Sequence, residues 1–118
     1  MWKVYAYAGC DTCRRAMKYL AARGIAHEVI AIREQPPSWA ELRRMLDHLG
    51  GDLRRLFNTS GQDYRALGLG AKLQDLSTDE AIGLLAGNGN LVKRPFVLPP
   101  TGGTVGFDAA KWDELAKR

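Results

Sequence analysis

Two cysteines separated by two residues are the part of this sequence best suited to chemistry. Cys10 and Cys13 are the chain's two cysteines, and they lie where a short apolar strand is predicted to run into a helix. This spacing can close a small disulfide ring and places Cys10 at the helix start and Cys13 one turn inside it. Because unpaired N–H groups and the macrodipole at a helix N-terminus favour negative charge, we expect the pKa of Cys10 to fall below about 8.5. The pattern therefore predicts a thiolate nucleophile.

A zinc site and a pair of inert buried thiols are the alternative uses of this pattern. The four candidate zinc ligands are Cys10, Cys13, His27 and His48. The gap from Cys13 to His27 suits a zinc finger, but twenty residues separate the histidines where about three to five are expected. We therefore predict no metal site. The position of both cysteines before a helix favours a redox pair over inert thiols.

Length and composition are those of one ordinary soluble domain. Of the 118 residues, 46% are hydrophobic and 25% are charged, so we predict a single domain over residues 1–118 that needs no disulfide for stability. No apolar run in the sequence approaches the roughly 18 residues of a membrane span. The residues before Cys10 are too few for a signal peptide and include Lys3. We expect a cytoplasmic monomer without a membrane partner.

Basic residues outnumber acidic ones by 17 to 13, which gives a net charge of +4. They occur in scattered pairs, such as Arg43-Arg44 and Lys93-Arg94, and form no continuous tract. We therefore expect most of them on solvated helix faces and predict no direct binding to nucleic acid. Some of these charges could favour anionic small molecules.

The elements that must position the cysteines fall into two halves. Residues 2–7 are predicted as a buried strand, residues 11–23 as a helix and residues 27–32 as a second strand, which together make a βαβ unit. Near the end of the chain, residues 96–98 and 104–107 are predicted as an antiparallel pair of strands joined by a tight turn. Asp108 then caps a last helix.

The stretch between these halves, about residues 38–90, is predicted to be helical. Two capping boxes mark helix starts, Ser38 with Glu41 and Ser77 with Glu80, and shorter helical stretches are expected at 52–57 and 64–67. Residues 58–61 form either a self-satisfied turn or a loop beside the active site. The whole order is that of an α/β, thioredoxin-like fold: a four-stranded mixed sheet with a helical insertion between the βαβ and ββα halves.

Several separated motifs in this order resemble the arsenate reductase-like family, a branch of the thioredoxin fold that also contains the Spx transcription regulators and small thiol reductases. The motifs cover nearly the whole chain: Tyr5 to Arg15 with the cysteine pair, Ile32-Arg33-Glu34-Gln35-Pro36-Pro37, Leu56-Phe57-Asn58-Thr59-Ser60-Gly61, and Leu91-Val92-Lys93-Arg94-Pro95-Phe96-Val97. The resemblance implies that Cys10 is the nucleophile. It also implies that Arg94 binds an oxyanion and that Pro95 is a cis-proline facing Cys10.

Residues at the start of the predicted helix are further candidates for substrate binding. Asp11, Thr12 and Arg14, with the free N–H groups of the first turn, are predicted to hold an anionic or sulfur-containing substrate together with Arg94 and Pro95. An arginine within about 4–6 Å would lower the pKa of Cys10 by a further 1–3. Glutaredoxin-linked arsenate reductases carry two more arginines near the anion; the positions that align with them hold Asn58 and Phe107. Those arsenate reductases also lack a cysteine at the position that aligns with Cys13.

The cysteine pair therefore predicts a thiol–disulfide oxidoreductase in which Cys10 attacks and Cys13 resolves the mixed disulfide. No bound cofactor is predicted. The resemblance implies glutathione or another small thiol as a co-substrate, with glutaredoxin or thioredoxin as candidate partners. Two alternatives stay open: a redox-sensing regulator like Spx, in which the disulfide changes binding to RNA polymerase, and a glutaredoxin-linked arsenate reductase.

Overall fold

The computed structural model describes residues 1–117 and is built on one four-stranded mixed sheet in the order β2-β1-β3-β4. Strands β1 (Trp2–Ala6) and β2 (His27–Ala31) run parallel, with Trp2 opposite His27 and Ala6 opposite Ala31. Strand β3 (Phe96–Leu98) is antiparallel to β1, and β4 (Thr104–Val105) is antiparallel to β3. The predicted mixed sheet is confirmed.

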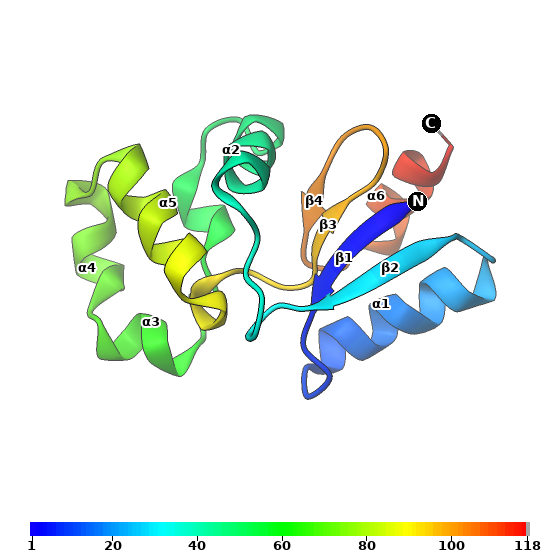
Figure 1. Ribbon diagram of the computed structural model, residues 1–118, viewed down its shortest axis with the longest axis horizontal. Helices are drawn as coiled ribbons and strands as arrows, with labels where there is room; N and C mark the ends of the chain where they lie inside the picture. The colour runs from blue at the N-terminus through cyan, green and yellow to red at the C-terminus, as the bar shows by residue number, and fades with distance from the viewer. Residues whose placement is uncertain (118) are drawn as a thin grey trace.

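Side chains alternate between the two faces of the sheet, and helices cover both faces (Figure 1). Helices α1 (Asp11–Ala22) and α6 (Ala109–Ala116) pack on one face. The buried residues of that core are Trp2, Val4, Ala6, Cys13, Ala16, Tyr19, Leu20, Val97, Trp112 and Leu115. The resolving-cysteine candidate is therefore part of a packed apolar core.

The other face is covered by the helical elements that lie in the chain between β2 and β3 (Figure 1). These are α2 (Trp39–His48), η1 (Leu53–Leu56), α3 (Gln62–Ala66), α4 (Leu69–Lys72), η2 (Leu73–Asp75), α5 (Thr78–Gly87) and η3 (Gly89–Leu91). Their apolar side chains meet Tyr5, Phe96 and Leu98 from the sheet. The apolar side chains of residues 42–49 and 82–85 supply much of this core.

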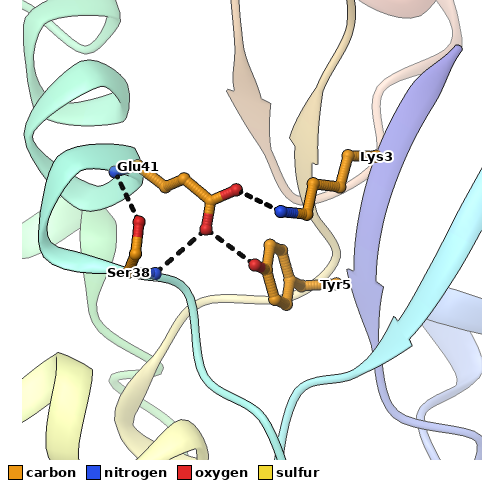
Figure 2. Close-up of polar contacts among 4 residues, drawn as sticks. All are labelled: Lys3, Tyr5, Ser38 and Glu41. Atoms are coloured by element: carbon orange, nitrogen blue, oxygen red, sulfur yellow. Dashed lines mark hydrogen bonds and ion pairs between the residues drawn. The ribbon is translucent and has the colours of Figure 1, made fainter.

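Both predicted capping boxes are present, and the first one also connects helix α2 to the sheet. The Glu41 carboxylate accepts hydrogen bonds from the Ser38 backbone N–H at 3.0 Å, the Tyr5 hydroxyl at 2.6 Å and the Lys3 ammonium at 2.7 Å (Figure 2). The second box, at Ser77 and Glu80, makes the same two capping bonds. The first capping box therefore also anchors α2 to the sheet, because Glu41 bonds to residues of β1 whereas Glu80 bonds only to its own cap.

The structure differs from the sequence prediction at several element ends. Strand β4 has two residues instead of the expected four, because Gly106 adopts a left-handed φ of +74° and Phe107 turns into the aromatic cluster around Trp112. Strands β1 and β2 and helix α1 each end one residue early. The short elements α4, η2 and η3 were not predicted, since runs of three or four residues carry too little periodicity. No helix within residues 1–117 is long and apolar enough to cross a membrane.

Candidate active site

Cys10 is the N-cap residue of α1, with an extended backbone and a partly exposed side chain. Its Sγ accepts a hydrogen bond from the Cys13 backbone N–H at 3.4 Å, and its own N–H donates to the Tyr7 carbonyl at 3.0 Å. A sulfur atom thus takes the place that a serine or aspartate oxygen usually fills at a helix start. Both cysteines are free thiols.

The pKa values of the two thiols are shifted in opposite directions although the residues are three positions apart. Partial burial of Cys10 raises its pKa, but hydrogen bonds from Cys13 and the nearby charge of Arg94 outweigh that effect, so the pKa lies below the ordinary 9.0. Cys13 is only 1% exposed, and burial raises its pKa to about 11. Cys10 is therefore the more readily ionised of the two thiols, and Cys13 stays protonated at neutral pH.

Arg94 supplies the charge that acts on Cys10. The Arg94–Pro95 peptide bond is cis, which agrees with the expectation from the resemblance. The Arg94 Nη1 atom is buried and has no hydrogen-bond partner among residues 1–117. A buried guanidinium nitrogen without a partner is costly, so this atom marks where an anionic acceptor would be favourable.

Tyr7 provides the surface on which that guanidinium rests. The Arg94 Cζ atom lies 5.1 Å from the centre of the Tyr7 ring, and the Arg33 Cζ atom lies 4.7 Å from the same centre. The backbone at Gly9 passes so close that a Cβ there would lie 2.7 Å from the ring. Glycine is therefore needed at position 9 for the ring to occupy this place.

Cys10 opens onto a cavity of about 740 Å³, called the Cys10 cavity below. Its lining residues are Tyr7, Gly9, Cys10, Thr12, Arg33, Asn58, Ser60, Gly61, Gln62, Asp63, Arg65, Asn90, Lys93 and Arg94. The predicted site residues Cys10, Thr12 and Arg94 thus come together. Asp63, Arg65 and Asn90 had no signal in the sequence, because helices far along the chain bring them here; Arg33 and Lys93 lay inside the family-like motifs.

Other predicted site residues are placed elsewhere. Asp11 and Arg14 form an ion pair with each other, and Arg14 also donates to the Ala8 carbonyl at 3.3 Å. Neither lines the Cys10 cavity; Arg14 and Cys13 instead border a smaller apolar cavity of about 350 Å³. Pro95 is buried, and its carbonyl accepts a hydrogen bond from the Gly106 N–H at 2.9 Å.

The loop at residues 58–61 combines the two interpretations left open by its sequence. The Gly61 N–H donates to the Asn58 carbonyl at 3.0 Å, which closes a turn. Asn58, Ser60 and Gly61 also line the Cys10 cavity. The loop is fixed there because the Asn58 N–H donates to the Leu91 carbonyl at 2.7 Å, just before Arg94 in the chain.

The candidate zinc ligands are dispersed. His27 Nδ1 lies 2.7 Å from the Ile25 carbonyl, at the start of β2, while His48 is exposed at the end of α2. Over residues 1–117, no three side chains of histidine, cysteine, aspartate or glutamate are grouped in a way that could hold a metal ion.

The model of the ArsC family matches residues 5–115, almost the whole chain. The chain belongs to the ArsC family. It is 44% identical over 110 residues to the uncharacterised protein YusI of Bacillus subtilis, and the match covers 93% of each protein. It is also 31% identical over 97 residues to an arsenate reductase of Neisseria meningitidis, with 81% of each chain covered.

Solved structures of ArsC proteins have the same fold as this member of the family. An ArsC family related protein from Bacteroides fragilis superposes with a TM-score of 0.91 at 36% identity, covering 97% of this chain and 96% of that one. A protein from Streptococcus mutans described as a possible arsenate reductase gives a TM-score of 0.89 at 42% identity, with 97% of each chain covered. The family resemblance and the thioredoxin-like fold expected from the sequence are both confirmed.

Proposed function

We propose that this ArsC-family protein is a thiol–disulfide oxidoreductase in which Cys10 is the nucleophile and Cys13 the resolving cysteine. The observation that carries the proposal is the asymmetry of the pair: Cys10 is partly exposed and acidic, while Cys13 is buried with a pKa of about 11. A partly exposed thiol that ionises readily, beside a buried thiol that stays protonated, is the arrangement that a two-step exchange needs.

The proposed cycle begins when the Cys10 thiolate attacks one sulfur of a substrate disulfide R–S–S–R′. A Cys10–S–R bond forms and R′–S⁻ leaves, taking the proton of the Cys13 thiol. Cys13 then attacks Cys10 Sγ, which releases R–S⁻ and leaves a Cys10–Cys13 disulfide. Two electrons have passed to the substrate, and an external thiol must return them.

We propose glutathione or another small thiol as that reductant, with glutaredoxin or thioredoxin as protein donors, in the reducing conditions of the cytoplasm. The Cys10 cavity supports a small charged thiol, because Arg33, Arg65 and Arg94 could meet carboxylates and Asp63 could meet an ammonium group.

Disulfide turnover in the two single-cysteine variants tests the proposal. Cys10→Ser should abolish turnover, because no thiolate remains to attack. Cys13→Ser should stop the cycle after the first step and accumulate a mixed disulfide on Cys10, which intact-mass spectrometry detects. Full turnover by Cys10→Ser would disprove the proposal. Formation of the internal disulfide without turnover would favour a redox-sensing regulator, for which co-elution with RNA polymerase is the next measurement.

Arsenate reduction is a second candidate, favoured by the relatives that carry the name arsenate reductase. Of the two positions that align with anion-binding arginines in glutaredoxin-linked enzymes, Asn58 lines the Cys10 cavity, while Phe107 packs edge-on against Trp112 at 4.9 Å. The third anion-binding arginine of those enzymes aligns with Arg94, which is an arginine in this chain as well. Arsenate-dependent oxidation of glutathione with glutaredoxin present measures this activity directly; its absence, with disulfide turnover present, would exclude arsenate as a substrate.

A further inference from the structure

A second cavity, of about 400 Å³, lies beside the Cys10 cavity and is strongly basic. Four cationic side chains border it: Arg15, Arg55, Lys93 and Lys111. We call it the cationic cavity. Its remaining lining residues are Thr12, Thr104, Val105, Gly106, Phe107 and Asp108.

The four cations come from parts of the chain that only the fold brings together. Arg15 is on α1, Arg55 on η1, Lys93 precedes β3 and Lys111 is on α6. The Lys93 N–H donates to the Leu56 carbonyl at 2.8 Å, which fixes Lys93 next to Arg55 along the backbone. The backbone positions of the four residues are therefore set by the packing of separate elements, while the side chains themselves are exposed.

Within residues 1–117, these four side chains form no ion pairs. None of the four lies within 4.0 Å of a carboxylate of residues 1–117, whereas Lys3, Arg14, Arg23 and Arg43 each form such a pair. Asp108 is the single acidic residue of the lining, and its Oδ1 accepts hydrogen bonds from the N–H groups of Ala110 and Lys111 as the α6 cap. Four like charges around one cavity repel one another, so an anionic ligand would stabilise the arrangement.

The cationic cavity is continuous in its lining with the active site. Thr12, two residues from Cys10, and Lys93, next to Arg94, border both cavities. The two cavities are therefore neighbours, separated by the side chains of these two residues. Each lining has four cationic side chains and one acidic side chain, so both cavities favour anionic groups; neutral amide side chains line the first cavity and none line the second.

We propose that the cationic cavity binds the phosphate group of a low-molecular-weight disulfide whose sulfur is attacked by Cys10, an inference that rests on the proposed function. A phosphate suits four converging cations because it is a dianion with several acceptor oxygens, which arginine and lysine bind well. A small molecule fits this open cavity, whose volume lies within the roughly 300–1,000 Å³ of small-molecule sites. The exchange is the one given above, with the phosphate on the R group; the phosphate takes no part in bond breaking.

Two disulfides that differ in phosphate alone test the proposal. These are the disulfide of 4′-phosphopantetheine and pantethine, which shares its arm and lacks the phosphates. We expect the wild-type protein to prefer the phosphorylated disulfide at least about tenfold in kcat/KM at low salt, a ratio that corresponds to about 1.4 kcal/mol. The preference should shrink as ionic strength rises.

The double variant Arg55→Gln/Lys111→Gln should lower this preference about tenfold, since it removes two of the four cations. A matched control, Lys18→Gln/Lys72→Gln, loses the same net charge from exposed positions that line neither cavity, and should keep the wild-type preference. Equal kcat/KM for both disulfides in the wild-type protein would overturn the proposal, as would an equal loss of preference in both double variants.

A binding measurement separates this proposal from the proposed function. The S-methyl thioethers of 4′-phosphopantetheine and pantetheine cannot exchange with Cys10, so calorimetric titration measures their binding without turnover. Tighter binding of the phosphorylated thioether, with turnover of neither disulfide, would retain the phosphate site and overturn the proposal that Cys10 attacks such a disulfide. Equal binding of the two thioethers would disprove the phosphate site, whatever the turnover.

Discussion

At the scale of single residues, the cysteine pair shows how one residue type acquires two behaviours. The Cys10 sulfur receives N–H donors at the start of α1 and the charge of Arg94, while the Cys13 sulfur is packed among apolar side chains. Hydrogen bonds and positive charge lower the pKa of a thiol, and burial raises it. The division of labour between nucleophile and resolving thiol follows from these surroundings.

Replacing Arg94 by glutamine should raise the pKa of Cys10, because the nearby positive charge is lost while the N–H donors of the helix remain. The pH dependence of Cys10 alkylation, measured in a Cys13→Ser background, reports this pKa. The control Arg94→Lys keeps the charge and should recover part of the shift. An alkylation profile that does not change in Arg94→Gln would remove Arg94 from the site.

Gly9→Ala should act on Cys10 through the Tyr7 ring. The added Cβ would lie 2.7 Å from that ring, so the ring must move, and Arg94 loses its support. We expect a higher pKa of Cys10 in Gly9→Ala, measured by the same alkylation profile. Tyr7→Phe keeps the ring and should leave the profile unchanged. A wild-type profile for Gly9→Ala would show that the ring does not support Arg94.

At the scale of elements, helix α2 is tied to strand β1 by the Glu41 carboxylate. Burial raises the pKa of this carboxyl, but the bonds from Lys3, Ser38 and Tyr5 outweigh it and hold the pKa below the ordinary 4.5. The same bonds act on Tyr5, where burial and the bond to Glu41 raise the pKa to about 12. The carboxylate therefore stabilises the contact between the helices and the sheet when it is ionised and Tyr5 is protonated.

Glu41→Gln should lower the free energy of unfolding by about 1.5 kcal/mol, at the lower end for bonds to a charged group because Lys3 is partly exposed. Glu80→Gln removes the charge of a carboxylate that makes only the capping-box bond, which glutamine can keep, and should cost less. Urea unfolding at neutral pH measures both. Equal losses in the two variants would mean that the bonds to β1 add nothing to the cap.

The pH dependence of stability follows from the same carboxylate. Its pKa is depressed in the folded protein, so its contribution is complete above the ordinary value of 4.5 and is lost as the pH falls through the folded value. The wild-type protein should therefore lose more unfolding free energy between pH 6 and about pH 3 than Glu41→Gln. Parallel acid limbs in the two proteins would contradict this expectation.

At the scale of the whole molecule, two apolar cores share the sheet between them. Neighbouring residues of one strand, such as Val4 and Tyr5, or Phe96 and Val97, belong to opposite cores. Loss of either core would expose one face of the sheet and so destabilise the strands on which the other core packs. That coupling argues for the single domain predicted from the sequence.

One cooperative unfolding transition is the expected outcome. In Trp39→Phe the remaining tryptophans, Trp2 and Trp112, report the core beneath α1 and α6, while far-ultraviolet circular dichroism reports all the helices. The two signals should give the same urea midpoint. Separate midpoints would show that the helical segment between β2 and β3 unfolds independently and that the chain is not one domain.

The sequence by itself determined the order of the main elements, both capping boxes and the placement of the cysteine pair at a helix start. These features are local: periodicity, caps and turn residues act over a few positions, so they can be recognised without a fold. The family motifs added Arg94 and the cis bond before Pro95, which no local pattern would have indicated.

Only the tertiary structure decided which side chains face Cys10. Arg14 was predicted to lie in the site because it is near Cys10 in sequence. In the structure it forms an ion pair with Asp11 and lines the smaller apolar cavity. Arg65 is distant in sequence and lines the Cys10 cavity. The four residues of the cationic cavity come together for the same reason. Which charges share a cavity depends on how helices and strands pack across the sheet, and that long-range geometry leaves no pattern in a local stretch of sequence.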